Sequence, residues 1–272
     1  MIAERNHLPD TNRLSVLAAT ILLAYALLPF VKIPETRFAF EVSGILFTYQ
    51  LSLTTITSLL NSALAAAGTD WLLRGHPHLG RQKTFQHWLL PALTTWVIGV
   101  PLGTLAVGWQ WWTVLAFGGL LLVLVLVAEY IAVDLNDVRH TPAAIGLTAV
   151  SFALFLILAI TLAAAGSRLY VLLPWLMLAI FLVALRTLYL RLGGRWCFSW
   201  SLGVALVVAQ AAAGLHYWPI SPLRFGLLVL GFAYALTSAA GAIEEKRSWR
   251  TLWIEPAVMV VILWGLAAGA VD

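Results

Sequence analysis

The chain has 272 residues, of which 61% are hydrophobic and only 10% are charged, whereas soluble domains carry about 25% charged residues. A soluble core cannot bury this much apolar surface, so the composition excludes an ordinary soluble domain and predicts one integral membrane domain over residues 1–272. Sixteen Lys and Arg with a net charge of +4 are too few and too scattered for nucleic-acid binding, and the single Cys197 excludes a disulfide framework.

The first predicted span, residues 14–33, follows a polar N-terminal segment. Its apolar run is longer than the roughly 7–15 residues of a signal-peptide core. Pro34 and Glu35 follow it in place of a small-residue cleavage site. We therefore predict a first span that the mature protein retains.

Residues 37–53, RFAFEVSGILFTYQLSL, do not follow the pattern of a plain helix. Apolar residues alternate with smaller or polar ones from Phe38 to Val42 and again from Ile45 onward, on either side of a Ser-Gly pair. This period of two predicts a β-hairpin on the outer face, before the second span. The alternative is an early start of that span as one long helix, because an isolated hairpin is only marginally stable.

Nine segments have the roughly 20 apolar residues that a spanning helix needs. Short connections join them, and lipid excludes an open sheet because its edges could not be satisfied there. We therefore predict an all-α, up-and-down transmembrane bundle. Its spans cover residues 14–33, 51–73, 87–108, 111–133, 144–165, 169–190, 197–215, 223–242 and 251–271.

The basic residues set the orientation of these spans. The side that holds the N-terminus and loops 74–86, 134–143, 191–196 and 243–250 carries twelve of the sixteen Lys and Arg, and the other side carries four. Positive residues favour the cytoplasm. We predict a multi-pass protein of the cell membrane with its N-terminus in the cytoplasm and its C-terminus outside.

Ionisable residues within or beside the spans are the candidate functional residues, because charge is costly in a bilayer. Glu129 and Arg186 each lie about one turn inside the inner end of a span, so we predict that they interact directly or through water. The alternatives are a staple between two helices, or an Arg186 that extends to the lipid headgroups. The candidate polar cluster is Asp70, Glu129, Asp134, Asp137, Arg186 and Glu244.

The segment GAIEEKRSWRTLWIEP, residues 241–256, places six charges between two apolar runs. Its three cations are what a cytoplasmic loop requires, and Glu255-Pro256 is suited to the first turn of the last span. We interpret the segment as a topological hinge, with an active site at the membrane surface as the alternative. Its adjacent glutamates resemble those of CAAX-protease-like membrane endopeptidases, but the spacing to Arg250 and the absence of a later His argue against that activity.

Cofactor sites are not predicted. VDLNDVRH, residues 133–140, resembles half of the aspartate-rich motif of membrane prenyltransferases, which hold Mg²⁺ and diphosphate. A second motif is absent, and a solvated acidic turn is the simpler interpretation. His87 and His140 lie near the inner face and His216 near the outer face, roughly 30 Å away, so they cannot share one haem iron.

Two stretches, LAAAGTDWLLRGHP (64–77) and LHYWPISPLRFG (215–226), resemble an uncharacterised family of bacterial polytopic membrane proteins. The resemblance extends over most of the chain and implies a bacterial cytoplasmic membrane. It implies no functional motif.

We predict a non-enzymatic protein, either a transporter of a small solute or lipid or a subunit of a larger membrane complex, because little chain remains for soluble domains. Its partners would be the lipid bilayer and other membrane proteins. The alternative is a lipid-modifying enzyme with its polar site at the cytoplasmic interface. Convergence of the acids on one cavity would favour the enzyme, and dispersal would favour the first prediction. These acids are Asp70, Glu129, Asp134, Asp137 and Glu244.

Overall fold

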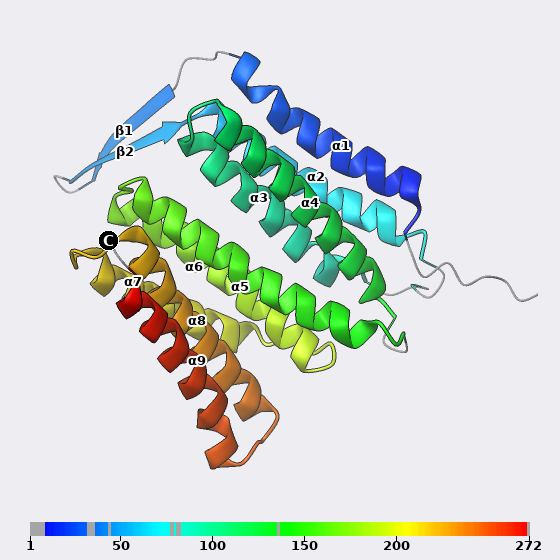
Figure 1. Cartoon of the computed structure of the whole chain (residues 1–272), viewed down its shortest axis with the longest axis vertical. Helices are drawn as coiled ribbons and strands as arrows, with labels where there is room; N and C mark the ends of the chain where they lie inside the picture. The colour runs from blue at the N-terminus through cyan, green and yellow to red at the C-terminus, as the bar shows by residue number, and fades with distance from the viewer. Residues whose placement is uncertain are drawn as a thin grey trace, which may run out of the picture. The chain divides into compact units, whose positions relative to one another are not determined.

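The computed structural model describes residues 9–31, 36–42, 45–76, 79, 83–134 and 137–270. Apart from one pair of short strands, the regular secondary structure there is helical, and turns and short connections join the elements (Figure 1). In chain order the elements are α1 (Thr11–Ala26), η1 (Leu28–Phe30), β1 (Thr36–Val42), β2 (Ile45–Leu51), α2 (Leu53–Leu73), η2 (Phe85–His87), α3 (Leu89–Thr104), α4 (Trp109–Ile131), α5 (His140–Ala164), α6 (Leu169–Arg191), α7 (Phe198–His216), α8 (Pro222–Glu244) and α9 (Trp249–Gly269). The prediction of a helical fold is thereby confirmed, and the number of spans is a separate question.

The elements divide into two compact units, Met1–Val133 and Asp134–Asp272. In the first unit, α1 and α3 each contact α2 and α4, which makes a bundle of four helices. In the second unit, α8 contacts α5, α6, α7 and α9. Whether these two units form the single domain predicted over residues 1–272 depends on how they join, so the single domain stays a prediction.

Six helical segments in the described part of the chain are long and apolar enough to cross a membrane. Helices α2, α3 and α9 correspond to the remaining three predicted spans, although α9 begins two residues earlier than predicted, and they are not among these six. The 16 residues of α3 extend about 24 Å, less than the roughly 30 Å hydrocarbon core. Polar residues such as Asn61 and Asp70 interrupt the apolar sequence of α2. Length and hydropathy therefore support six of the nine predicted spans.

Between α1 and α2, the strands β1 and β2 pair antiparallel over the residues that carry the alternating pattern. The register places Val42 opposite Ile45 and Phe40 opposite Phe47. The predicted turn at Ser43-Gly44 falls on residues outside the described part of the chain. Helix α2 begins only at Leu53, after the second strand, and the outer location of the strands stays a prediction.

A close crossing of three helices organises the first unit. Tyr25 of α1 is fully buried, and its hydroxyl donates to the carbonyl of Thr95 on α3 over 2.7 Å. Gly99, one turn further along α3, lies directly beside Ser58 of α2 and the same tyrosine. A Cβ at Gly99 would lie 2.7 Å from the Ser58 Cβ and 2.9 Å from the Tyr25 hydroxyl. Glycine is therefore what lets these helices approach, as small residues do in membrane bundles.

We expect Gly99→Ala to lower the stability of the folded chain by about 1–3 kcal/mol, because the added methyl group overpacks this crossing. Thermal unfolding of the detergent-solubilised protein would measure the change. Gly146→Ala on α5 is the matched control, since no atom of another helix lies within 4 Å of a Cβ there. Equal melting temperatures for the two variants would contradict the close crossing.

Candidate functional site

The second unit contains a partly open cavity of about 730 Å³, lined by α5, α6, α8 and α9. Its charged residues gather where α6 and α8 end and where α5 and α9 begin. Away from these helix ends, the wall is mostly apolar. The lining residues are His140, Thr141, Ala144, Ile145, Thr148, Ala149, Phe152, Thr187, Leu190, Arg191, Leu230, Tyr234, Thr237, Ser238, Arg247, Glu255, Met259 and Leu263.

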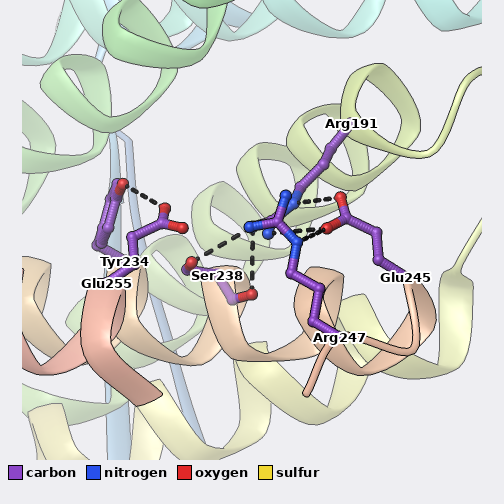
Figure 2. A network of polar contacts seen from close by, with 6 residues as sticks. All are labelled: Arg191, Tyr234, Ser238, Glu245, Arg247 and Glu255. Atoms are coloured by element: carbon purple, nitrogen blue, oxygen red, sulfur yellow. Dashed lines mark hydrogen bonds and ion pairs between the residues drawn. The ribbon is translucent and has the colours of Figure 1, made fainter. Parts of the chain in front are cut away.

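Two arginines share one glutamate at the charged end of the cavity (Figure 2). Arg191 donates from Nε to Glu245 Oε1 over 2.7 Å and from Nη2 to Oε2 over 3.2 Å. Arg247 makes its ion pair with Oε2 of the same carboxylate, 2.5 Å from its Nε. Arg191 also donates from Nη1 to the carbonyl oxygen and hydroxyl of Ser238, over 3.2 and 3.3 Å. Glu245 and Ser238 thus fix the guanidinium of Arg191 from two directions.

The local sequence explains why this cluster forms at the helix ends. Arg191 is the last residue of α6, where a cation is favoured by the helix dipole. Gly241 leaves space for it, since a Cβ there would lie 2.9 Å from the Arg191 Cδ. Glu245 follows α8 directly, and Lys246 then adopts a positive φ of 54°. This left-handed turn ends the helix and places Arg247 beside Glu245.

A second polar pair lies one helical turn further into the cavity, counted along α8 from Ser238. The hydroxyl of Tyr234 on α8 donates to Glu255 Oε1 on α9 over 3.0 Å. In Figure 2, this pair lies on one side of the two guanidinium groups and Glu245 lies on the other side. Ser238 lies between the pair and the guanidinium groups. Of the residues that the structure describes, Glu245 does not line the cavity, whereas Glu255 does. The charged part of the cavity wall therefore contains two cations, Arg191 and Arg247, and separately one carboxylate, Glu255.

The apolar part of the cavity extends toward the middle of the unit. Phe152 of α5 packs against the ring of Tyr234, with 5.2 Å between the ring centres, so the apolar part begins beyond these two residues. Leu230, Met259 and Leu263 continue the apolar surface on α8 and α9. The arrangement can hold a molecule with one charged end and one apolar end.

Three acids of the predicted polar cluster lie in this unit, and they are not among the described residues that line the cavity. Glu244 accepts a hydrogen bond of 2.7 Å from Trp200 Nε1 and lies 3.7 Å from Arg195 Nη1. Asp137 accepts from the backbone N–H of Arg139 over 2.8 Å, which closes its own turn. Asp134 lies in the same short connection before α5.

The other two acids of the predicted cluster lie in the first unit. Asp70 accepts from Arg74 Nε over 2.8 Å and from the hydroxyl of Thr84. Glu129, with none of its surface exposed, lies 2.7 Å from His87 Nδ1. The sequence placed His87 near the inner face without showing that it meets a carboxylate from α4.

The predicted Glu129–Arg186 interaction would join the two units and stays a prediction. Arg186 is 1% exposed within α6, and its guanidinium lies 5.7 Å from the centre of the Tyr189 ring. Within the described residues, no group of three His, Cys, Asp or Glu is placed to hold a metal ion.

The sequence pointed to the acids of this site more clearly than to their partners. Glu245 and Glu255 belong to the charged segment 241–256, which we interpreted as a hinge. Arg191 counted only as a loop cation, and Tyr234 and Ser238 carried no signal of function. Their spacing of four residues on α8 puts both on one face, but only the neighbouring helices show that this face borders a cavity.

These apolar helices indicate a polytopic membrane protein. The chain belongs to the family described as "Protein of unknown function (DUF5656)", whose model matches residues 33–270. The resemblance to an uncharacterised family, carried by stretches 64–77 and 215–226, is thereby confirmed. No curated protein and no solved structure matches the chain.

The ion pairs of Glu245 predict a dependence of stability on pH. The hydrogen bonds from Arg191, helped by the charge of Arg247, hold the pKa of Glu245 below its ordinary value of 4.5, although burial acts in the opposite direction. A carboxylate with a lowered pKa contributes stability that is present above its ordinary pKa and is lost as the pH falls through the folded value.

We therefore expect the melting temperature of the wild-type chain to fall as the pH drops below about 4.5. Glu245→Gln should be less stable at neutral pH and less sensitive to acid. Glu244→Gln, which changes the neighbouring acid, should keep the acid sensitivity of the wild type. Parallel acid profiles for wild type and Glu245→Gln would contradict this role.

Proposed function

We propose that this chain is a non-enzymatic, transporter-like membrane protein that binds a membrane amphiphile in the cavity of its second unit. One observation carries the proposal: a cavity of about 730 Å³ that is charged at one end and mostly apolar beyond it. That volume lies within the roughly 300–1,000 Å³ of ligand pockets in proteins. A small polar solute would need polar groups along the whole cavity, whereas an amphiphile matches both of its parts.

The depth of the cavity favours a lipid as this amphiphile. One leaflet of the hydrocarbon core is about 15 Å thick. The apolar wall beyond the charged end, from Glu255 to Leu263, extends about 12 Å along α9, and both residues line the cavity. A lipid with its headgroup at the helix ends would therefore place its chains in the apolar part, and the lipid bilayer is the proposed source of the ligand.

The proposed topology keeps all nine spans, with α2, α3 and α9 as the short or more polar ones. Residues beside the ends of a short span can complete the crossing, because bilayers thin locally around it. The split of twelve basic residues against four supports a cytoplasmic N-terminus and an external C-terminus. In this topology the charged end of the cavity faces the cytoplasm and takes its ligand from the inner leaflet.

The enzyme alternative receives less support. It requires the predicted acids to converge on one cavity. In the second unit, Glu244 and Asp137 have other partners, and neither is among the described residues that line the cavity. Dispersed acids beside an amphipathic cavity favour binding and movement of a ligand over chemistry on it.

Filling the cavity should remove the bound amphiphile. Ala144→Trp adds a large side chain to the wall of the cavity, and we expect several-fold less lipid to co-purify with the protein, as measured by mass spectrometry. Ala164→Trp is the matched control, because Ala164 is exposed at the other end of the same helix. Equal lipid content in both variants would contradict the proposal.

Reporter fusions at the two termini test the topology. A reporter that is active only in the cytoplasm should work at the N-terminus, and one that is active only outside should work at the C-terminus, because nine spans put the ends on opposite sides. Termini on the same side would mean an even number of spans.

A further inference from the structure

The charged end of the cavity presents opposite charges at two places, and we propose that its ligand is a zwitterionic phospholipid. The phosphate would bind to Arg191 and Arg247, and the ammonium group would bind to Glu255. The inference rests on the proposed function, because it names the class of amphiphile that the same cavity takes.

The arginine pair is prepared to bind a phosphate. Glu245 holds both guanidinium groups by their Nε atoms, and Ser238 fixes Arg191 further. The contacts above use four of the five N–H donors of Arg191 and one of those of Arg247, so Arg247 offers most of the donors to phosphate oxygens. The fixed orientation of both groups lowers the entropy lost on binding. Both side chains remain accessible, since Arg191 is 20% and Arg247 is 47% exposed.

Glu245 positions the arginines without occupying the ligand's place. Among the described residues, the cavity wall contains both arginines but not Glu245, and Figure 2 shows Glu245 on the side away from Tyr234 and Glu255. A phosphate that approaches from the cavity therefore has no carboxylate to displace. Glu245 acts as a positioning residue in this arrangement.

Glu255 supplies the site for the ammonium group. One carboxylate oxygen accepts from the Tyr234 hydroxyl over 3.0 Å, which orients the group at the cavity wall. A carboxylate has about four acceptor positions, so further donors can bind to it. A primary ammonium group can then donate to Glu255 and also contact the ring of Tyr234.

The spacing and the total charge of the site both match a zwitterion. Tyr234, which holds Glu255, and Ser238, which holds Arg191, lie one turn apart on α8, about 6 Å along the helix axis. A two-carbon linker between phosphate and ammonium, as in phosphoethanolamine, spans a similar distance. The two positive charges of the arginines cancel the two negative charges of Glu245 and Glu255. A ligand without net charge therefore leaves the net charge of these four residues and the ligand at zero. A purely anionic headgroup would place negative charge near Glu255.

A binding experiment with defined lipids tests this inference. The purified full-length chain in a neutral detergent would be titrated with dioleoyl lipids and followed by native mass spectrometry. We expect phosphatidylethanolamine to bind about tenfold more tightly than phosphatidylglycerol, the effect of one favourable charge contact. Glycerophosphoethanolamine, the soluble headgroup without chains, should compete only weakly. Strong competition by this headgroup would mean that the ligand is the free headgroup and would overturn the lipid assignment.

Three variants assign the charges. Glu255→Gln should remove the preference for phosphatidylethanolamine, and Glu255→Lys should reverse it in favour of phosphatidylglycerol. Arg247→Gln should weaken both lipids, because both carry a phosphate. Glu244→Gln, the matched control outside the described cavity wall, should leave the preference unchanged. Melting temperatures near that of the wild type would show that each variant is folded.

The outcomes separate this inference from the proposed function. Equal binding of both lipids, with loss of both in Ala144→Trp, would overturn the zwitterion assignment and keep the amphiphile site. Tighter binding of phosphatidylglycerol by the wild type would overturn the role of Glu255. Failure of every lipid to bind to the wild type would overturn the proposed function itself.

Discussion

The bidentate ion pair between Arg191 and Glu245 is the interaction on which the second unit depends at its charged end. It joins the last residue of α6 to the turn after α8, two points 54 residues apart in the chain. Paired hydrogen bonds of this kind fix geometry as well as charge. Because Glu245 also holds Arg247, one carboxylate sets the position of two cations and thereby the character of the cavity.

The bilayer explains why this cluster lies at helix ends. Charged groups are expensive in hydrocarbon and inexpensive near the headgroups, which favours Arg191 in the last turn of α6 and Glu245 just beyond α8. The same constraint leaves the deeper part of the cavity to residues such as Leu230 and Leu263. A gradient from charged to apolar along one cavity follows, and it matches the gradient along a lipid molecule.

The first unit manages charge in a different way. Glu129 lies within α4 with none of its surface exposed, and His87 from the short helix η2 supplies a partner 2.7 Å away. A buried carboxylate without such a partner would be strongly destabilising. Polar pairs between elements distant in sequence thus occur in both units. In each pair, one residue belongs to a long apolar helix, Glu129 to α4 and Arg191 to α6.

The sequence by itself determined the apolar helices and the uncharacterised family, because these features are written in the order of neighbouring residues. It left open whether residues 37–53 pair as strands or begin the second helix early. It also drew attention to Glu129 and to the charged segment 241–256. Only the tertiary structure decided that His87 meets Glu129, that Arg191 meets Glu245, and that Tyr234 meets Glu255. Side chains 42 and 54 residues apart come together only through the choice of which helices pack side by side. An apolar helix surface does not fix that choice alone, because contacts between apolar side chains are not directional.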